Sequence, residues 1–285
     1  MDSLWMVIAS LGFSLMGYFV KICSQYFDYQ EIVFWRMLFA TTVLLAIAKV
    51  KGQSIKTSHF KNHVIRGVIG TIALILYFYL ITYLPLATAI TLSYTSVIWF
   101  IVFSFFILKQ KVSLLVLFCA TLGLIGVALL VQPTFSQGQI GITLVGILTG
   151  VISALAYIQV KQLTILKEPE WRIVFYFSLI GTTITGIWSS FSGFHTVTLE
   201  NFVYILFMGA SALVGQMCMT LAYSKKDLFM SSILSYLTIV FSFLIGFFIL
   251  GDQLSLKEGI GILLIVASGL MSSLFNRNKV KSARN

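Results

Sequence analysis

The chain has 285 residues, of which 59% are hydrophobic and only 10% are charged, and its formal net charge is +10. Soluble domains are typically about 45–50% apolar and about 25% charged, so this composition indicates an integral membrane protein with no room for a soluble domain. The basic residues lie in short connections and at the C-terminus, which is a pattern of membrane orientation, and we therefore expect no nucleic-acid partner.

Ten apolar segments follow one another along the chain, joined by short connections. A membrane helix needs about 20 apolar residues, and lipid offers no hydrogen-bond partner to an open backbone. The sequence therefore predicts an all-α membrane protein with ten transmembrane helices. The predicted spans cover residues 3–22, 31–50, 64–84, 87–108, 113–132, 141–160, 172–190, 201–223, 228–250 and 256–275.

Lysine and arginine are divided unequally between the two sides that these spans define. Sixteen of the nineteen fall on one side, Arg66 and Arg284 among them, while Lys21 and Lys257 fall on the other and Arg36 lies inside the second span. Cytoplasmic connections are the basic ones, so both termini are predicted to be cytoplasmic.

A segment between Leu92 and Leu114 recurs between Leu234 and Leu256 at an offset of 142 residues, with nine identities and no gap. The offset is almost half of the chain, which indicates two copies of one five-helix unit. Because five is odd, the units start on opposite sides of the membrane and lie inverted, as in many secondary transporters. We place the units at residues 1–133 and 139–276, followed by a cytoplasmic basic tail at 277–285. Duplication without transport is the alternative.

Polar and aromatic side chains inside the spans are the candidates for a substrate site. Thr91, Thr95 and Trp99 share one face of the fourth span, and the repeat pairs Tyr94 with Tyr236. We expect a central cavity lined by the fourth and ninth spans, with hydroxyls for hydrogen bonds and rings for stacking. For each hydroxyl the alternative is helix packing. The candidates are Ser14, Tyr18, Arg36, Tyr77, Thr91, Tyr94, Thr95, Trp99, Tyr157, Gln216, Ser235, Tyr236 and Thr238.

Arg36 is the basic residue that the charge count assigns to neither side of the membrane. It lies about 7–8 Å deep, at ~1.5 Å per residue, and a guanidinium there costs a few kcal/mol unless it is paired or hydrated. It can extend to the outer headgroups, bond helix ends with Glu31 or Asp28 as a partner, or bind a substrate carboxylate or phosphate bidentately. The sequence leaves these three alternatives open.

No constellation in the sequence indicates catalysis, so we predict that the protein is not an enzyme and holds no metal or cofactor. The cysteines form no CxxC pair and the histidines have no metal-ligand spacing. Every Asp and Glu lies in a loop or at the end of a span, which leaves a proton relay little to work with and favours facilitated diffusion or exchange. The cysteines are Cys23, Cys119 and Cys218, and the histidines are His59, His63 and His195.

Several segments resemble the signature of the EamA family, in the drug/metabolite transporter superfamily. In the first half these are Arg66-Gly67, Gly70, Tyr77-Phe78-Tyr79, Leu84-Pro85-Leu86-Ala87 and Leu92-Ser93-Tyr94-Thr95-Ser96, and in the second half Gln216, Ala222-Tyr223, Ser235-Tyr236, Gly251-Asp252 and Gly259-Ile260-Gly261. Ser96 stands where the family often has proline, and neither the fourth nor the ninth span contains a proline. Gln110 replaces an acidic residue that is usual after the fourth span, whereas Asp252 keeps its counterpart.

The resemblance implies a carrier of small organic metabolites, such as amino acids, nucleosides or cofactors, in the bacterial cytoplasmic membrane. The inverted repeat adds alternating access, in which a fixed site opens to either side in turn. The expected partners are a small-molecule substrate and membrane lipids, with the chain a monomer or a homodimer. The alternative is a flippase or exporter of lipids or amphipathic compounds with the same fold.

Overall fold

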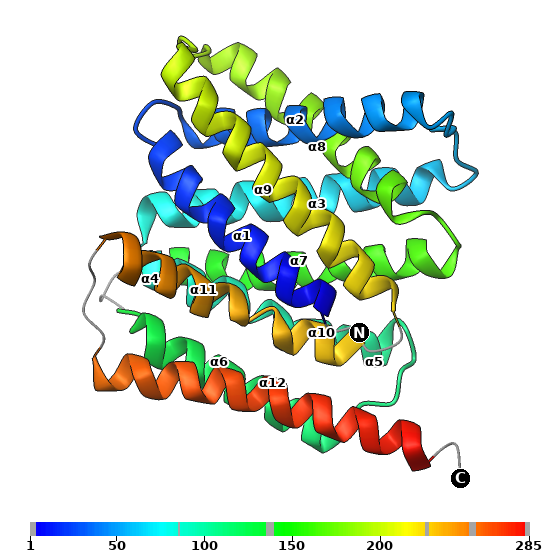
Figure 1. Cartoon of the computed structure of the whole chain (residues 1–285), viewed down its shortest axis with the longest axis vertical. Coiled ribbons are helices and arrows are strands. Elements are labelled where there is room, and N and C mark those ends of the chain that lie inside the picture. The colour runs from blue at the N-terminus through cyan, green and yellow to red at the C-terminus, as the bar shows by residue number, and fades with distance from the viewer. Residues whose placement is uncertain (1–3, 85, 135–139, 226–227, 251–254, 283–285) are drawn as a thin grey trace.

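A computed structural model of the chain describes residues 4–84, 86–134, 140–225, 228–250 and 255–282 (Figure 1). Within these ranges every regular element is a helix. Predictions that involve Pro85, Asp252 and Arg284, and the boundary at residue 139, fall outside the described residues.

The described residues contain ten helices long and apolar enough to cross a membrane, which confirms the predicted fold class. In this count α4 and α5 form one span, as do α10, α11 and the π-helical turn η1. The elements are α1 (Leu4–Cys23), α2 (Tyr29–Val50), α3 (Phe60–Tyr83), α4 (Leu86–Tyr94), α5 (Ser96–Phe106), α6 (Leu114–Val131), α7 (Ile140–Ile165), α8 (Glu170–Ser192), α9 (Leu199–Ser224), α10 (Leu228–Leu234), α11 (Leu237–Ile245), η1 (Gly246–Leu250) and α12 (Leu256–Ser282).

Local side chains set several of the helix ends. The Ser113 hydroxyl accepts a hydrogen bond from the Val116 N–H at 3.3 Å and caps the start of α6, and Gln132 ends that helix in the left-handed conformation. Thr198 and Asn201 cap the start of α9 reciprocally, because each side chain accepts from the other's backbone N–H. Because these side chains satisfy backbone groups at the helix ends, no additional loop residues are needed for that purpose.

The helix contacts repeat across the two halves of the chain. Helix α1 packs on α9 just as its counterpart α7 packs on α3, and α5 packs on α7 as α11 packs on α1. Helices α6 and α12 pair with one another, as do α2 and α8, and Figure 1 shows these two pairs at opposite edges of the bundle. A pseudo-two-fold axis relating two inverted five-helix repeats requires this pattern of contacts.

Glycines allow the closest of these helix pairs to touch. A Cβ on Gly126 of α6 would lie 2.8 Å from the Gly261 carbonyl oxygen of α12, and a Cβ on Gly261 would lie 2.7 Å from the Gly126 oxygen. A Cβ on Gly12 of α1 would come within 2.9 Å of the Gly215 nitrogen of α9. The absence of a side chain therefore fixes both interfaces at backbone-to-backbone distance.

The fourth and ninth spans are interrupted, although they were predicted as continuous helices and contain no proline. Helix α4 ends at Tyr94, and α10 ends at Leu234. At the first break the Thr95 hydroxyl donates to the Leu92 carbonyl at 2.5 Å, and at the second the Ser235 hydroxyl donates to the Ser232 carbonyl at 2.6 Å. At each break a hydroxyl thus adds a second donor to a carbonyl that also accepts a backbone N–H. The two hydroxyls are not equivalent in the repeat, because Ser235 corresponds to Ser93.

Candidate functional site

Arg36 of α2 lines a small cavity between the two repeats and is only 5% exposed. Helix α2 belongs to the first repeat, and the other walls come from α8 and α9 of the second. The cavity is narrow in this conformation, with space for no more than about one water molecule. The lining residues are Arg36, Met37, Ala40, Phe177, Ser178, Ala212, Leu213 and Gln216.

A second buried arginine, Arg66 of α3, reaches the same region and is 3% exposed. Its guanidinium carbon lies 4.2 Å from the centre of the Phe177 ring, and Phe177 also lines the cavity. A Cβ at Gly70 would overlap the Nη1 atom of Arg66, so the guanidinium occupies space that Gly70 leaves free along α3. Glycine at this position therefore lets the arginine extend along its own helix and over Phe177, which lines the cavity although Arg66 itself does not.

Neither guanidinium has a partner among the described residues. The ion pairs in that part of the chain belong to Glu31 and Glu168, and no hydrogen bond of Arg36 or Arg66 is found there. Tyr157 of α7 interacts electrostatically with both arginines, and the two arginines repel one another. Buried charges are normally paired, so the region carries uncompensated positive charge.

Two further candidates lie at this cluster. The Gln216 side chain of α9 lines the cavity and has no hydrogen-bond partner among the described residues, although an unpaired buried amide is costly. Tyr157 stacks on Tyr223 with ring centres 5.3 Å apart, and Tyr77 of α3 lies near enough to interact with it. Arg36, Tyr77, Tyr157 and Gln216 thus come together.

The predicted pairing of Tyr94 with Tyr236 is present, since their ring centres are 6.0 Å apart. Tyr236, however, is fully buried in an apolar cluster, and its hydroxyl donates to the Ala120 carbonyl at 3.1 Å. Tyr94 is only half-buried. The two rings are therefore not equivalent, and Tyr236 has a packing role that its position in the repeat does not show.

Most of the remaining candidate hydroxyls bond to backbone carbonyls. The Ser14 hydroxyl lies 2.7 Å from the Ser10 carbonyl oxygen and 2.8 Å from the Thr238 carbonyl oxygen, so its one proton is shared between them and joins α1 to α11. Thr95 and Ser235 close the helix breaks described above. Of the others, Trp99 stacks on Phe103, Tyr18 packs edge-on against Phe19, and Thr91 and Thr238 are half-buried.

Comparison with known proteins identifies the family. Two segments, residues 2–132 and 139–274, match the sequence profile of the EamA-like transporter family. The chain belongs to this family. It is 33% identical over 279 residues to an uncharacterized transporter of Helicobacter pylori, covering 94% of this chain and 93% of that one. It is 30% identical over 239 residues to a pseudopaline exporter of Pseudomonas aeruginosa, covering 83% of each chain.

One solved crystal structure superposes on this EamA-like transporter with a TM-score of 0.85, at 17% sequence identity and over 97% of this chain and 98% of the other. Identity at that level shows the fold alone. Together with the ten apolar helices, the family match makes the protein a multi-pass membrane transporter of the EamA type.

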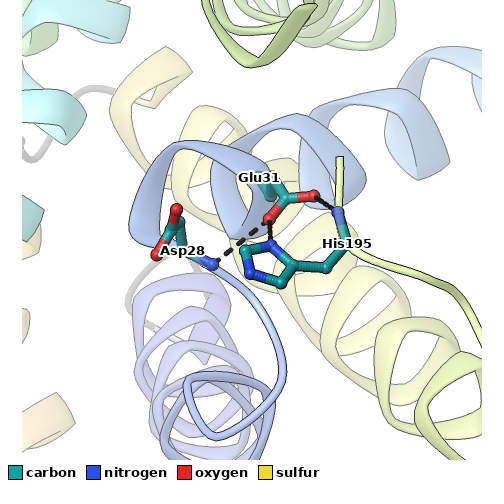
Figure 2. A group of neighbouring side chains, drawn as sticks. All are labelled: Asp28, Glu31 and His195. Atoms are coloured by element: carbon teal, nitrogen blue, oxygen red, sulfur yellow. Dashed lines mark hydrogen bonds and ion pairs between the residues drawn. The ribbon is translucent and has the colours of Figure 1, made fainter. Parts of the chain in front are cut away.

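The EamA-like transporter also has a carboxylate–histidine cluster at one end of α2, the His195 anchor (Asp28, Glu31 and His195), shown in Figure 2. Glu31 is fully buried and accepts hydrogen bonds from the His195 backbone N–H at 2.7 Å, from its Nδ1 at 2.5 Å and from the Asp28 N–H at 3.3 Å. The hydrogen bond between the His195 ring and the Glu31 carboxylate, together with the charge of Glu31, raises the pKa of His195.

The three side chains of the His195 anchor offer oxygen and nitrogen atoms within 4.8 Å of one another, which is close enough for metal ligands. The hydrogen bonds explain the cluster without a metal: they fasten the α8–α9 loop to the first turn of α2. Glu31 was one of the two partners that the sequence offered for Arg36, but in the structure it bonds to His195 instead.

A second cluster, the Glu168 anchor (Thr57, His59, His63, Glu168 and Arg172), lies at one end of α8. The Glu168 carboxylate accepts from Thr57, from Arg172 at 2.9 Å and from His59 at 3.1 Å, and His63 lies 3.4 Å away. Burial alone would raise the pKa of this carboxyl, but the hydrogen bonds outweigh it and lower the pKa to about 2. The cluster ties the α2–α3 loop to α8.

Arg66 is the functional candidate that sequence reasoning missed. We counted it with the basic connections and began the third span at residue 64, but α3 begins at Phe60 and buries Arg66. The polar residues Lys61 and His63 give the first turns of α3 the composition of a connection. The spacing of four between Arg66 and Gly70 on one helix face is the signal that could have indicated it.

Proposed function

We propose that the protein carries a small organic metabolite across the bacterial cytoplasmic membrane by alternating access, with both termini in the cytoplasm. The observation that carries this proposal is the cavity of Arg36 and Gln216, which lies between helices of the two inverted repeats. Secondary transporters place their substrates at such repeat interfaces. Among the described residues, the walls come from α2, α8 and α9, and not from the fourth and ninth spans that the sequence predicted.

The lining of the cavity supports a polar substrate. Arg36 and Gln216 lie in its wall, and a charged and an amide side chain suit a polar metabolite better than the acyl chains of a lipid. The relative named as a pseudopaline exporter supports transport of a small molecule by this fold. The described spans hold acidic residues only near their ends, and we therefore infer facilitated diffusion or exchange.

The test is uptake without an assumed substrate. Purified protein is reconstituted into liposomes, the liposomes are incubated with a bacterial small-molecule extract, and their contents are measured by mass spectrometry. We expect a small set of metabolites to enter these liposomes and to be excluded from protein-free ones. If no metabolite distinguishes the two preparations in either direction of loading, the carrier function is wrong.

A further inference from the structure

Arg36 and Arg66 share an environment that contains two positive charges and, among the described residues, no carboxylate paired with either. Both guanidiniums are more than nine-tenths buried, and the Nε and Nη1 atoms of Arg66 have no hydrogen-bond partner. A charged side chain within a membrane helix is costly unless it is paired or hydrated. Two unpaired and mutually repelling cations need a compensating anion.

We propose that this site binds a small organic dianion, such as a dicarboxylate, with one anionic group on Arg36 and the other on Arg66. The inference rests on the proposed function, because it names the substrate class of the same cavity. Two carboxylates neutralise both guanidiniums, whereas one leaves a buried positive charge. An arginine can bind each carboxylate through two parallel N–H donors, which gives strength and orientation.

The other walls favour an organic ligand over a bare inorganic ion. Met37, Ala40 and Phe177 offer apolar surface to a carbon skeleton, and the amide of Gln216 can bond to one additional polar group. Tyr157 stands near both arginines and can donate its hydroxyl to a bound carboxylate. A ligand with two acidic ends and a short apolar middle matches this distribution.

Gly70 is a positioning residue in this proposal. A methyl group at residue 70 would collide with the Arg66 guanidinium and with the Phe177 ring, whose Cε2 atom would be 2.8 Å from it. Gly70→Ala therefore displaces the Arg66 guanidinium without removing its charge. Gly17 supplies the matched control, because a Cβ at that helical glycine would meet nothing within 4 Å.

The test is ligand-dependent thermal stabilisation of the purified protein. The probes are succinate and glutarate, their uncharged dimethyl esters, and inorganic phosphate. We expect the dicarboxylates to raise the unfolding temperature of the wild type in a saturable way, and the esters to leave it unchanged. If neither diacid binds, or if the esters bind equally well, the proposal is wrong. Phosphate that binds as tightly as the diacids identifies an inorganic-anion site and also overturns it.

Variants then assign the two contacts. Arg36→Gln and Arg66→Gln should each weaken dicarboxylate binding by about tenfold to hundredfold, the equivalent of a lost charged hydrogen bond. Gly70→Ala should weaken it in the same direction, while Gly17→Ala and the exposed-cation control Lys49→Gln should bind like the wild type. Unchanged affinity in both arginine variants would contradict the assignment, and the wild-type probes test the dianion itself if a variant does not fold.

The liposome experiment separates this inference from the proposed function. Uptake restricted to neutral or cationic metabolites would leave the carrier function in place and overturn the dianion site. Dicarboxylate binding without protein-dependent uptake of any metabolite would support the site and overturn the carrier function.

Discussion

Glu31 and Glu168 each bond to a histidine at opposite ends of the paired helices α2 and α8. Glu31, in the first turn of α2, bonds to His195 in the loop that follows α8, and Glu168, just before α8, bonds to His59 in the loop that follows α2. The inverted repeat thus fastens the same helix pair at both ends with a carboxylate and a histidine. Because a carrier opens one face at a time, the two anchors are candidates for the contacts that break in alternation.

The first prediction concerns the His195 anchor. Replacing both Glu31 and His195 by cysteine and oxidising the pair should stop metabolite uptake into liposomes, because a covalent bond prevents the loop from leaving α2. Reduction should restore uptake. The native cysteines Cys23, Cys119 and Cys218 are buried and free, which limits competing reactions.

Each single-cysteine variant, oxidised in the same way, is the control for damage by the oxidant. Uptake at the wild-type rate in a preparation that is fully cross-linked would show that the His195 anchor does not need to open during transport.

The Glu168 anchor should contribute measurably to stability. Glu168→Gln removes a buried carboxylate that accepts several hydrogen bonds, and we expect a loss on the order of 2 kcal/mol near neutral pH. Since the folded pKa is lowered to about 2, the stabilisation is present above the unfolded pKa of about 4.3 and is lost as the pH falls toward 2.

Thermal unfolding of wild type and Glu168→Gln from about pH 7 down to about pH 2, at about one-unit steps, measures this difference. Glu170→Gln is the matched control, because Glu170 stands two residues away and has no ion pair among the described residues. Equal destabilisation by both variants would mean that lost negative charge, and not the hydrogen bonds of Glu168, is responsible.

The third prediction is a pH dependence with the opposite sign. Glu31 raises the pKa of His195, so this histidine stabilises the fold fully below its unfolded pKa of about 6.5 and less as the pH rises through the folded pKa. The wild type should therefore lose a stability advantage over His195→Gln as the pH rises above about 6.5. Parallel unfolding curves for the two proteins across this window would refute the link.

The sequence predicted the fold closely because the fold depends on local and repeated properties. Apolar length gave the ten spans, and identities at Tyr94 and Tyr236 gave two units, whose inversion follows from the odd number of helices in each. The helix breaks were not predicted, because neither span contains a proline that would indicate one. Hydrogen bonds of the Thr95 and Ser235 hydroxyls lie at the breaks instead.

The site was predicted less completely, for a physical reason. Helical spacing places Ser14 on an inner face, but it cannot tell a hydroxyl that faces a cavity from one that bonds to a carbonyl, as Ser14 does. The environment of Arg66 depends on Gly70 of its own helix and on Phe177 of α8, which is more than 100 residues away in the sequence. Only the packed structure reveals such a contact.

Topology gives the fourth prediction. If the basic connections are cytoplasmic, a cysteine replacing Lys56 should resist an impermeant thiol reagent in intact cells and react after permeabilisation. A cysteine replacing Thr196, in the exposed α8–α9 loop, should react in intact cells. Equal labelling of both from outside would contradict the predicted orientation.

The last prediction separates two tyrosines that the sequence treated alike as lining residues. The hydroxyl of Tyr236 is buried and bonds to the Ala120 carbonyl, so Tyr236→Phe should cost about 1 kcal/mol of stability and leave uptake unchanged. The hydroxyl of Tyr157 has no hydrogen-bond partner among the described residues and stands near Arg36 and Arg66. Tyr157→Phe should therefore unfold like the wild type while uptake falls. Both variants are measured for unfolding temperature and for uptake in the same liposome preparation. The opposite result, with uptake lost in Tyr236→Phe and kept in Tyr157→Phe, would move the substrate site from the two arginines to the junction of the broken spans.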